Sequence, residues 1–126
     1  MNTIRVLIVD DAEQVRQGLR TILTLAGRGD EEGPIEIVGE APDGQEAVRQ
    51  AEILQPEVIL MDLEMPVMNG YEAARQIKAR CPGIRVIALT VHDYPATRHD
   101  AIRAGMDGFI VKGAPIETLL QAISRR

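Results

Sequence analysis

The chain has 126 residues, a usual size for one compact domain and too short for two. Apolar residues make up 45% of it but aromatic residues only 2%, so we expect a core of aliphatic side chains and methionine. The net charge of −5, with the basic residues scattered, argues against a domain that grips nucleic acid by itself. No stretch is apolar enough to span a membrane, and the single Cys81 fits a reducing cytosol, so we expect a cytoplasmic protein.

Five short apolar runs rich in β-branched residues predict five strands. They are Ile4–Val9, Ile35–Glu40, Val58–Met61, Arg85–Leu89 and Gly108–Val111. The first, third and fourth runs are almost continuously apolar, which is typical of strands covered on both faces.

Five helical segments follow these runs, and four of them have apolar residues spaced for one helix face. The residues that mark the first three helices are Val15, Leu19, Ile22 and Leu23; Ala47, Val48, Ala51 and Leu54; and Tyr71, Ala74 and Ile77. The fourth helix is predicted around Ala96–Ala104, and the last has Ile116, Leu119, Leu120 and Ile123 facing inward. Asp43 to Glu46 resembles a capping box at the second helix, and Gly105 marks the end of the fourth.

This alternation predicts βαβ units and therefore an α/β, flavodoxin-like, doubly wound sheet of five parallel strands in the order 2-1-3-4-5. The glycine-rich, acidic segment Gly27–Pro34 has no periodicity and is interpreted as a solvated connection between the first helix and the second strand. In such folds function gathers beyond the carboxyl ends of the strands.

Polar residues stand at the carboxyl ends of four of the predicted strands. They are Asp10 and Asp11 after the first, Asp62 after the third, Thr90 after the fourth and Lys112 after the fifth. Each has an ordinary alternative, since an Asp or Thr at such a point also caps helices: Asp10 or Asp11 the first helix, Thr90 the fourth. Any one of these residues could stand at its position by chance, but it is far less probable that the whole set does.

Three carboxylates that converge on one edge repel one another and need a compensating cation. Hard oxygen ligands with open positions suit Mg²⁺, which also accepts a phosphate oxygen. Asp62 stands alone on a middle strand and is the sensible nucleophile toward phosphorus, while the adjacent Asp10 and Asp11 are better placed as metal ligands, directly or through water. The Lys112 ammonium then neutralises phosphoryl charge, and Thr90 offers a hydroxyl.

Together these motifs resemble the receiver domains of response regulators in two-component signalling, over essentially the whole chain. The motifs are Val-Asp10-Asp11, Leu-Met-Asp62-Leu-Glu-Met-Pro66-Val-Met-Asn-Gly70, Ala-Leu-Thr90, Ala-Gly105-Met-Asp-Gly-Phe109 and Val-Lys112.

The resemblance implies that Asp62 accepts phosphate from a sensor histidine kinase. Asp11, Asp62 and the backbone carbonyl of Glu64 would hold Mg²⁺, and Asp10 would assist through water. Thr90 would turn toward the phosphate and Lys112 would pair with it. Such a chain is a phospho-acceptor switch and not a turnover enzyme.

The resemblance also implies how the signal leaves the domain. Phe109 occupies the position of an aromatic that moves inward with the threonine, although an ordinary core ring is an equal alternative. The fourth helix, fifth strand and fifth helix would form the responding surface, where relatives dimerise. Ile-Val-Gly-Glu40-Ala-Pro-Asp-Gly is similar to the subgroup with helix-turn-helix output domains, so residues 1–126 are expected to be the N-terminal receiver of a longer regulator that contacts DNA only through that output domain.

Three features depart from the family pattern. Val91 is bulkier than the usual residue; it either crowds access to Asp62 or is an ordinary strand-end residue. Glu64 and His92 occupy variable positions, where they either reach the phosphate edge and alter its lifetime or face solvent. Lys112 is followed by Gly-Ala-Pro115 and not directly by proline, which leaves a cis peptide after Lys112 open.

Three other functions compete with this interpretation. A phosphohydrolase using Asp62 would typically carry a second Asp two residues later, where this chain has Glu64. An interaction-only pseudo-receiver is disfavoured because the acidic residues, Thr90 and Lys112 are all retained. A flavin-binding module is disfavoured because acidic strand ends repel phosphate unless a metal intervenes.

Overall fold

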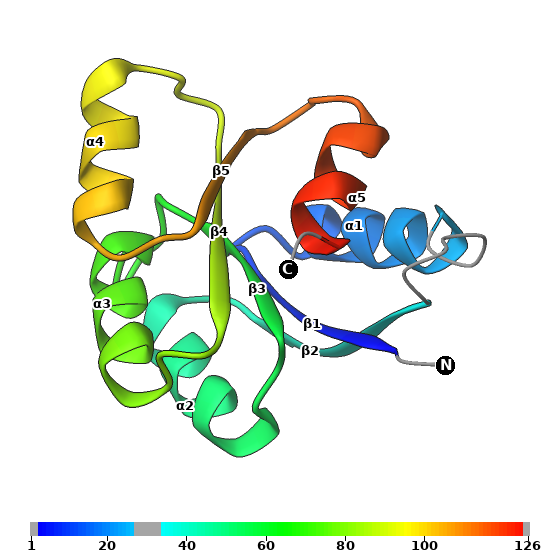
Figure 1. Ribbon diagram of the computed structural model, residues 1–126, viewed down its shortest axis with the longest axis horizontal. Coiled ribbons are helices and arrows are strands. Elements are labelled where there is room, and N and C mark those ends of the chain that lie inside the picture. Colours follow the sequence, from blue (N-terminus) through cyan, green and yellow to red (C-terminus); the bar gives the residue numbers. More distant parts are fainter. Residues whose placement is uncertain (1–2, 27–33, 125–126) are drawn as a thin grey trace.

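The computed structural model describes residues 3–26 and 34–124. Five parallel strands form one sheet in the order β2-β1-β3-β4-β5, as predicted (Figure 1). The strands are β1 (Ile4–Val9), β2 (Ile35–Ala41), β3 (Val58–Asp62), β4 (Arg85–Thr90) and β5 (Gly108–Val111). The predicted doubly wound, flavodoxin-like fold is confirmed.

Five helices cover the two faces of the sheet. They are α1 (Glu13–Ala26), α2 (Gly44–Leu54), α3 (Gly70–Arg80), α4 (Pro95–Arg103) and α5 (Ile116–Ser124). Helices α1 and α5 lie on one face, and α2, α3 and α4 lie on the other (Figure 1). Along β1, Leu7 and Val9 join the α2–α3–α4 core while Val6 and Ile8 join the α1–α5 core. Burial on both faces explains why this strand is apolar without alternation.

Three strands extend one residue beyond the predicted ends. Ladder pairing continues from Val9 to Ala41, from Asp62 to Leu89 and from Thr90 to Val111, so Asp62 and Thr90 belong to their strands. The predictions for β3 and β4 stopped at the last apolar residue of the run, whereas backbone pairing does not depend on side-chain polarity and includes Asp62 and Thr90.

Ile22 belongs to the apolar stripe predicted for the first helix, but it is 48% exposed. Leu23 carries the buried contact of α1 with the sheet. Ile22 instead lines a cavity of about 390 Å³ together with Val15 and Leu19 of α1 and Ile116 of α5. The apolar stripe of α1 is therefore wider than the face that the helix buries.

Local signals explain where helices begin and end. Asp43 accepts a hydrogen bond from the Glu46 N–H at 2.8 Å and caps α2, and Asn69 caps α3 in the same way through Glu72. Gly105, just after α4, has a φ of +90°. Apart from Pro34, the predicted connection Gly27–Pro34 lies outside the described residues. Within the described ranges, no helix has the length and apolarity needed to cross a membrane.

Candidate functional site

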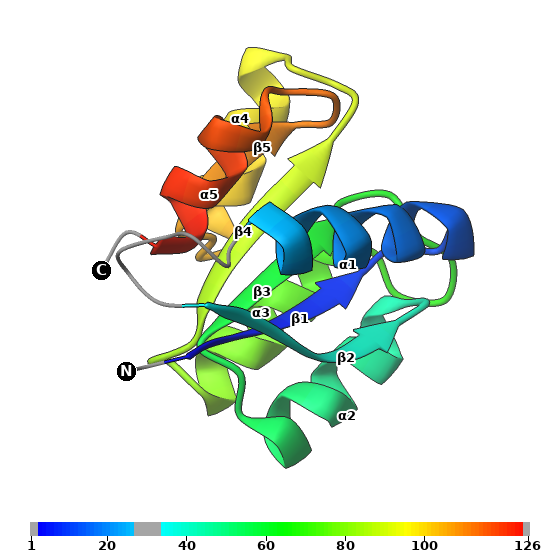
Figure 2. The ribbon, with the colours of Figure 1, turned by 90° about the vertical axis from the view of Figure 1, so that its right-hand side faces the viewer.

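The carboxyl ends of the parallel strands lie along one edge of the sheet (Figure 2). Asp10 and Asp11 follow β1, Asp62 ends β3, Thr90 ends β4 and Lys112 follows β5. The chain leaves β1 toward β2 on one side and reaches β3 on the other, so this edge includes the topological switch point. The fold thus brings the predicted polar residues to one place.

Two of the carboxylates are buried beside the lysine. Asp10 is 1% exposed and Asp62 is 4% exposed. The Lys112 Nζ lies 2.8 Å from Asp10 Oδ2 and 3.5 Å from Asp62 Oδ1. One ammonium therefore serves two buried carboxylates, which leaves a negative balance in the site.

This arrangement shifts the ionisation of both partners. Burial raises the pKa of Asp62, the charge of Lys112 opposes that rise, and the charge of Asp10 adds to it. Burial lowers the pKa of Lys112, but the hydrogen bond to Asp10 and the charges of both carboxylates outweigh burial and raise it. Lys112 is thus favoured as a cation, whereas the surroundings of Asp62 oppose its charged form and raise its pKa above the ordinary value.

The acidic residues have the donor set of a hard cation. Asp10, Asp11 and Asp62 each offer a carboxylate oxygen, and these oxygens all lie within 4.8 Å of one another. Asp11 is exposed, so the cluster opens to solvent on its side. The Glu64 N–H donates to Asp62 Oδ1 at 3.3 Å, which places the Glu64 backbone beside the cluster. Oxygen donors around an open position fit Mg²⁺.

Asp10 and Thr90 also make local hydrogen bonds. Asp10 Oδ1 accepts from the Ala12 N–H at 2.9 Å and stabilises the turn that leads into α1, so its local and its site contacts coexist. Thr90 Oγ1 accepts from the His92 N–H at 3.0 Å. The alternative that Thr90 caps the fourth helix is wrong, because Tyr94 is the N-cap residue of α4.

Glu64 and His92 contact each other across the mouth of the site. His92 Nε2 lies 3.3 Å from Glu64 Oε1, and the His92 ring stacks on Tyr94 with centroids 5.6 Å apart. A cavity of about 290 Å³ lies beside them and is also lined by Thr90. Val91 is 62% exposed. Spacing alone does not predict this pair, because it joins two loops of irregular backbone.

Phe109 is half-buried and packs against the core on the α2–α3–α4 face. The Arg98 guanidinium carbon lies 4.5 Å from the centroid of its ring. Another arginine, Arg16, lies beside the acidic residues and donates through Nη1 to the Asp10 carbonyl at 2.7 Å. Neither arginine belongs to a recognisable motif, so the sequence did not single them out.

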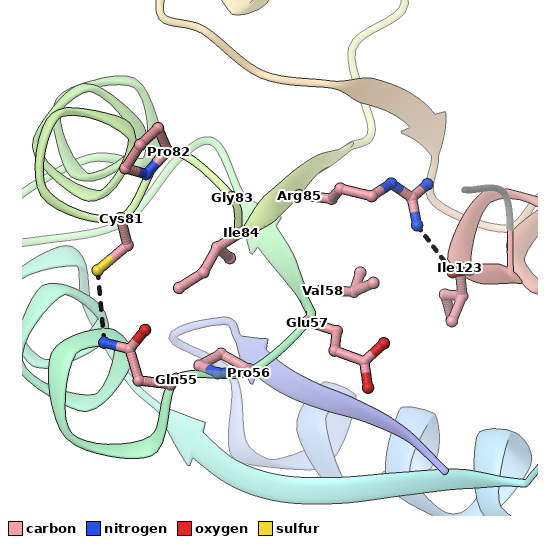
Figure 3. Close-up of a pocket in the computed structure, with 10 residues that line it drawn as sticks. All are labelled: Gln55, Pro56, Glu57, Val58, Cys81, Pro82, Gly83, Ile84, Arg85 and Ile123. Atoms are coloured by element: carbon pink, nitrogen blue, oxygen red, sulfur yellow. Dashed lines mark hydrogen bonds between the residues drawn. The ribbon is translucent and has the colours of Figure 1, made fainter. Parts of the chain in front are cut away.

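A larger cavity, of about 500 Å³, lies at the opposite edge of the sheet (Figure 3). It is lined by the segments that enter β3 and β4 and by the end of α5, including Cys81 and Arg85. Arg85 donates to the Ile123 carbonyl at 2.9 Å and so satisfies the end of α5. This cavity holds no counterpart of the acidic cluster.

Among the described residues every peptide bond is trans, including the one after Lys112.

Comparison with known proteins agrees with this geometry. The family described as response regulator receiver domain matches residues 6–124. The transcriptional regulatory protein DegU of Brevibacillus brevis is 34% identical over 97% of this chain and 49% of its own length. The receiver domain of the putative response regulator NarL from Mycobacterium tuberculosis superposes with a TM-score of 0.87 and 29% identity over 100% of both chains.

A third similar structure is that of a CheX–CheY–BeF3–Mg complex from Borrelia burgdorferi. It superposes with a TM-score of 0.83 and 28% identity, over 95% of this chain and 86% of that one. The chain spans about half the length of the curated relatives it matches.

Proposed function

Because this chain belongs to the response regulator receiver domain family, we propose that it is a phosphorylation switch whose acceptor is Asp62. The observation that carries the proposal is the pair of buried carboxylates, Asp10 and Asp62, that share the ammonium of Lys112 at the switch point of the sheet. A sensor histidine kinase is the proposed donor. Domains of this family act in two-component signalling, and relatives such as DegU are transcriptional regulators.

In the proposed reaction an Asp62 carboxylate oxygen bonds to phosphorus. The phosphorus–nitrogen bond of the donor phosphohistidine breaks, and its electron pair stays with the imidazole nitrogen. Mg²⁺ would be held by Asp11, Asp62 and the backbone carbonyl of Glu64, with Asp10 assisting through water, and would supply positive charge to the phosphoryl oxygens. Lys112 is already within 3.5 Å of the acceptor oxygen and supplies a second cation.

The phosphorylated state would form contacts that the resting state lacks. A phosphoryl group on Asp62 adds nearly two negative charges and strong acceptors. Thr90 is proposed to turn from the His92 N–H toward the phosphoryl group, with Phe109 repacking as the neighbouring strand responds. Since only differential contacts shift an equilibrium, these two residues couple the acceptor to the surface of α4, β5 and α5.

The residues around the mouth are proposed to set the lifetime of the phosphoryl group. Glu64 and His92 pair with each other at 3.3 Å and border the cavity beside Thr90, so they stand where attacking water would pass. Val91 is exposed next to Thr90 and would limit the size of small donors. Glu64 also stands where a phosphohydrolase would need its second Asp, and its side chain is engaged by His92, which disfavours substrate turnover.

The remaining proposals concern the whole regulator. We place the protein in the cytoplasm, as the N-terminal receiver of a longer chain whose output domain would contact DNA. Phosphorylation is proposed to favour a homodimer, which would appear as a concentration-dependent sedimentation mass.

The experiment that tests the acceptor is intact-protein mass after incubation with acetyl phosphate and Mg²⁺, with and without a chelator. We expect a Mg²⁺-dependent gain of one phosphoryl group in the unmodified protein and none in Asp62→Asn. Asp43→Asn is the matched control, because Asn caps a helix as well as Asp does. If Asp62→Asn is labelled as much as the unmodified protein, Asp62 is not the acceptor. If neither acetyl phosphate nor a kinase labels the unmodified protein, a pseudo-receiver is favoured.

A further inference from the structure

We propose that Arg98 is a brake on this switch. Its guanidinium clasps the Phe109 ring in the resting state and holds α4 against β5, so the phosphorylated conformation forms only after this clasp is released. This proposal rests on the proposed function. It means that Arg98, which lies outside the phosphorylation site, sets how strongly the unphosphorylated conformation is favoured.

The clasp consists of two contacts made by one side chain. The Arg98 guanidinium carbon lies 4.5 Å from the Phe109 centroid, within the range of a cation–π interaction. Arg98 Nε donates to Asp93 Oδ1 at 2.6 Å. Asp93 precedes α4 and Phe109 lies in β5, so Arg98 ties the loop before its own helix to the neighbouring strand.

Helix α4 has few other anchors. Of its side chains only Ala101 is buried, and its N-cap residue Tyr94 makes no side-chain capping bond. The first turn of α4 borders the cavity of about 290 Å³ through Thr97, and a second cavity of about 240 Å³ is lined by Ile102 of α4 and by Gly108 and Phe109 of β5. A helix held by so little packing is sensitive to the loss of one polar clasp.

The clasp is connected to the acceptor through the chain. Thr90 Oγ1 accepts from the His92 N–H, and this bond shapes the backbone immediately before Asp93. When Thr90 turns toward a phosphoryl group on Asp62, the His92 N–H loses its partner and the backbone that positions Asp93 is freed. Arg98 then loses the carboxylate that aims it at Phe109. The clasp therefore belongs to the resting state alone, and it biases the equilibrium toward that state.

The test measures the affinity for beryllofluoride, an analogue of the phosphoryl group, by calorimetric titration in Mg²⁺. If Arg98 stabilises the resting conformation, it lowers the fraction of protein in the conformation that binds beryllofluoride. The apparent affinity for beryllofluoride is then reduced by that fraction. Arg98→Ala should tighten binding by about two- to fivefold, as expected for an exposed cation–π contact. Arg75→Ala is the matched control, since Arg75 is 53% exposed against 51% for Arg98 and pairs only locally with Glu72 on α3; it should leave the affinity unchanged.

A second pair of variants separates the clasp from a general effect of lost charge. In a Phe109→Leu background, which removes the ring, Arg98→Ala should tighten binding no further. Equal or weaker binding by Arg98→Ala, or an undiminished effect in that background, would overturn the brake while leaving Asp62 as acceptor. If the unmodified protein binds no beryllofluoride with Mg²⁺, the proposed function falls and the brake falls with it.

Discussion

The carboxyl group of Asp62 lies where the protein opposes its ionisation. Burial raises its pKa, and the charge of Asp10 raises it further, against the attraction of Lys112. The 2.8 Å contact of Lys112 with Asp10 is shorter than its 3.5 Å contact with Asp62, so Asp62 receives the smaller share of the ammonium. A carboxylate buried in this way lowers the stability of the free protein, which fits the metal and phosphoryl binding that we propose for it.

We therefore expect Asp62→Asn to stabilise the protein at neutral pH in the presence of a chelator. A pKa that is higher in the folded state than in the unfolded state means that Asp62 supports folding while protonated. This support is complete below the unfolded pKa and is lost as the pH rises through the folded pKa. The increase in the free energy of unfolding caused by Asp62→Asn should be largest at neutral pH. It should shrink as the pH falls toward 3.8, the ordinary pKa of an aspartic acid side chain.

Urea unfolding of both proteins across that pH range measures the difference. A lower free energy of unfolding for Asp62→Asn at neutral pH would show that the attraction of Lys112 outweighs burial and the repulsion of Asp10.

At the scale of elements, the loop between β3 and α3 depends on a glycine that brings two backbones together. A Cβ on Gly70, the first residue of α3, would lie 2.3 Å from the Asp62 carbonyl oxygen and 2.9 Å from the Leu63 Cα. Both neighbours are backbone atoms, one in the last residue of β3 and one in the residue after it, so the clash cannot be relieved by a side-chain rotation.

Gly70→Ala should lower the free energy of unfolding by about 1–3 kcal/mol through overpacking, and it should slow labelling of Asp62. Gly83→Ala is the matched control, because a Cβ there meets nothing within 4 Å, and it should change stability by less than about 0.5 kcal/mol. Urea unfolding and phosphoryl labelling measure the two effects. Equal free energies of unfolding for the two variants would mean that the loop between β3 and α3 can move to accommodate the Cβ at no cost in stability.

The strands, their order and the meeting of Asp10, Asp62 and Lys112 were predictable from sequence, because carboxyl ends of parallel strands share an edge. The contacts of α4 were not. The helix Pro95–Arg103 buries one residue and has little apolar periodicity, so nothing in its sequence fixes which side chain meets Phe109. The Glu64–His92 pair escaped prediction for a related reason, since two irregular loops set its geometry.

Across the whole molecule, the two edges of the sheet have different tasks. At the amino edge, Arg5 donates to the Leu54 and Gln55 carbonyls at the end of α2, and Arg85 donates to the Ile123 carbonyl at the end of α5 (Figure 3). These bonds satisfy helix carbonyls with a cation, which is a favourable arrangement. The carboxyl edge instead concentrates buried negative charge. Helix ends are thus stabilised at one edge, and the residues of the proposed site lie at the other.

This division predicts that Mg²⁺ stabilises the whole fold. A cation among Asp10, Asp11 and Asp62 relieves repulsion that is present only when the chain is folded. At ten times the dissociation constant, binding adds about 1.4 kcal/mol, which raises the Tm by roughly 5 °C for a domain of this size. Asp11→Asn should lose most of this rise in Tm, because it removes one of the proposed ligand carboxylates. Since Asp11 is exposed, the substitution should disturb little packing.

Thermal unfolding monitored by circular dichroism, with Mg²⁺ titrated against each variant, measures the effect. Glu13→Gln is the matched control, because Glu13 is also exposed and acidic but lies outside the cluster, in the first turn of α1. It should keep the full Mg²⁺-dependent rise. A rise that is equal in all three proteins would point to a general effect of ionic strength, and no rise in the unmodified protein would count against a magnesium site at this edge.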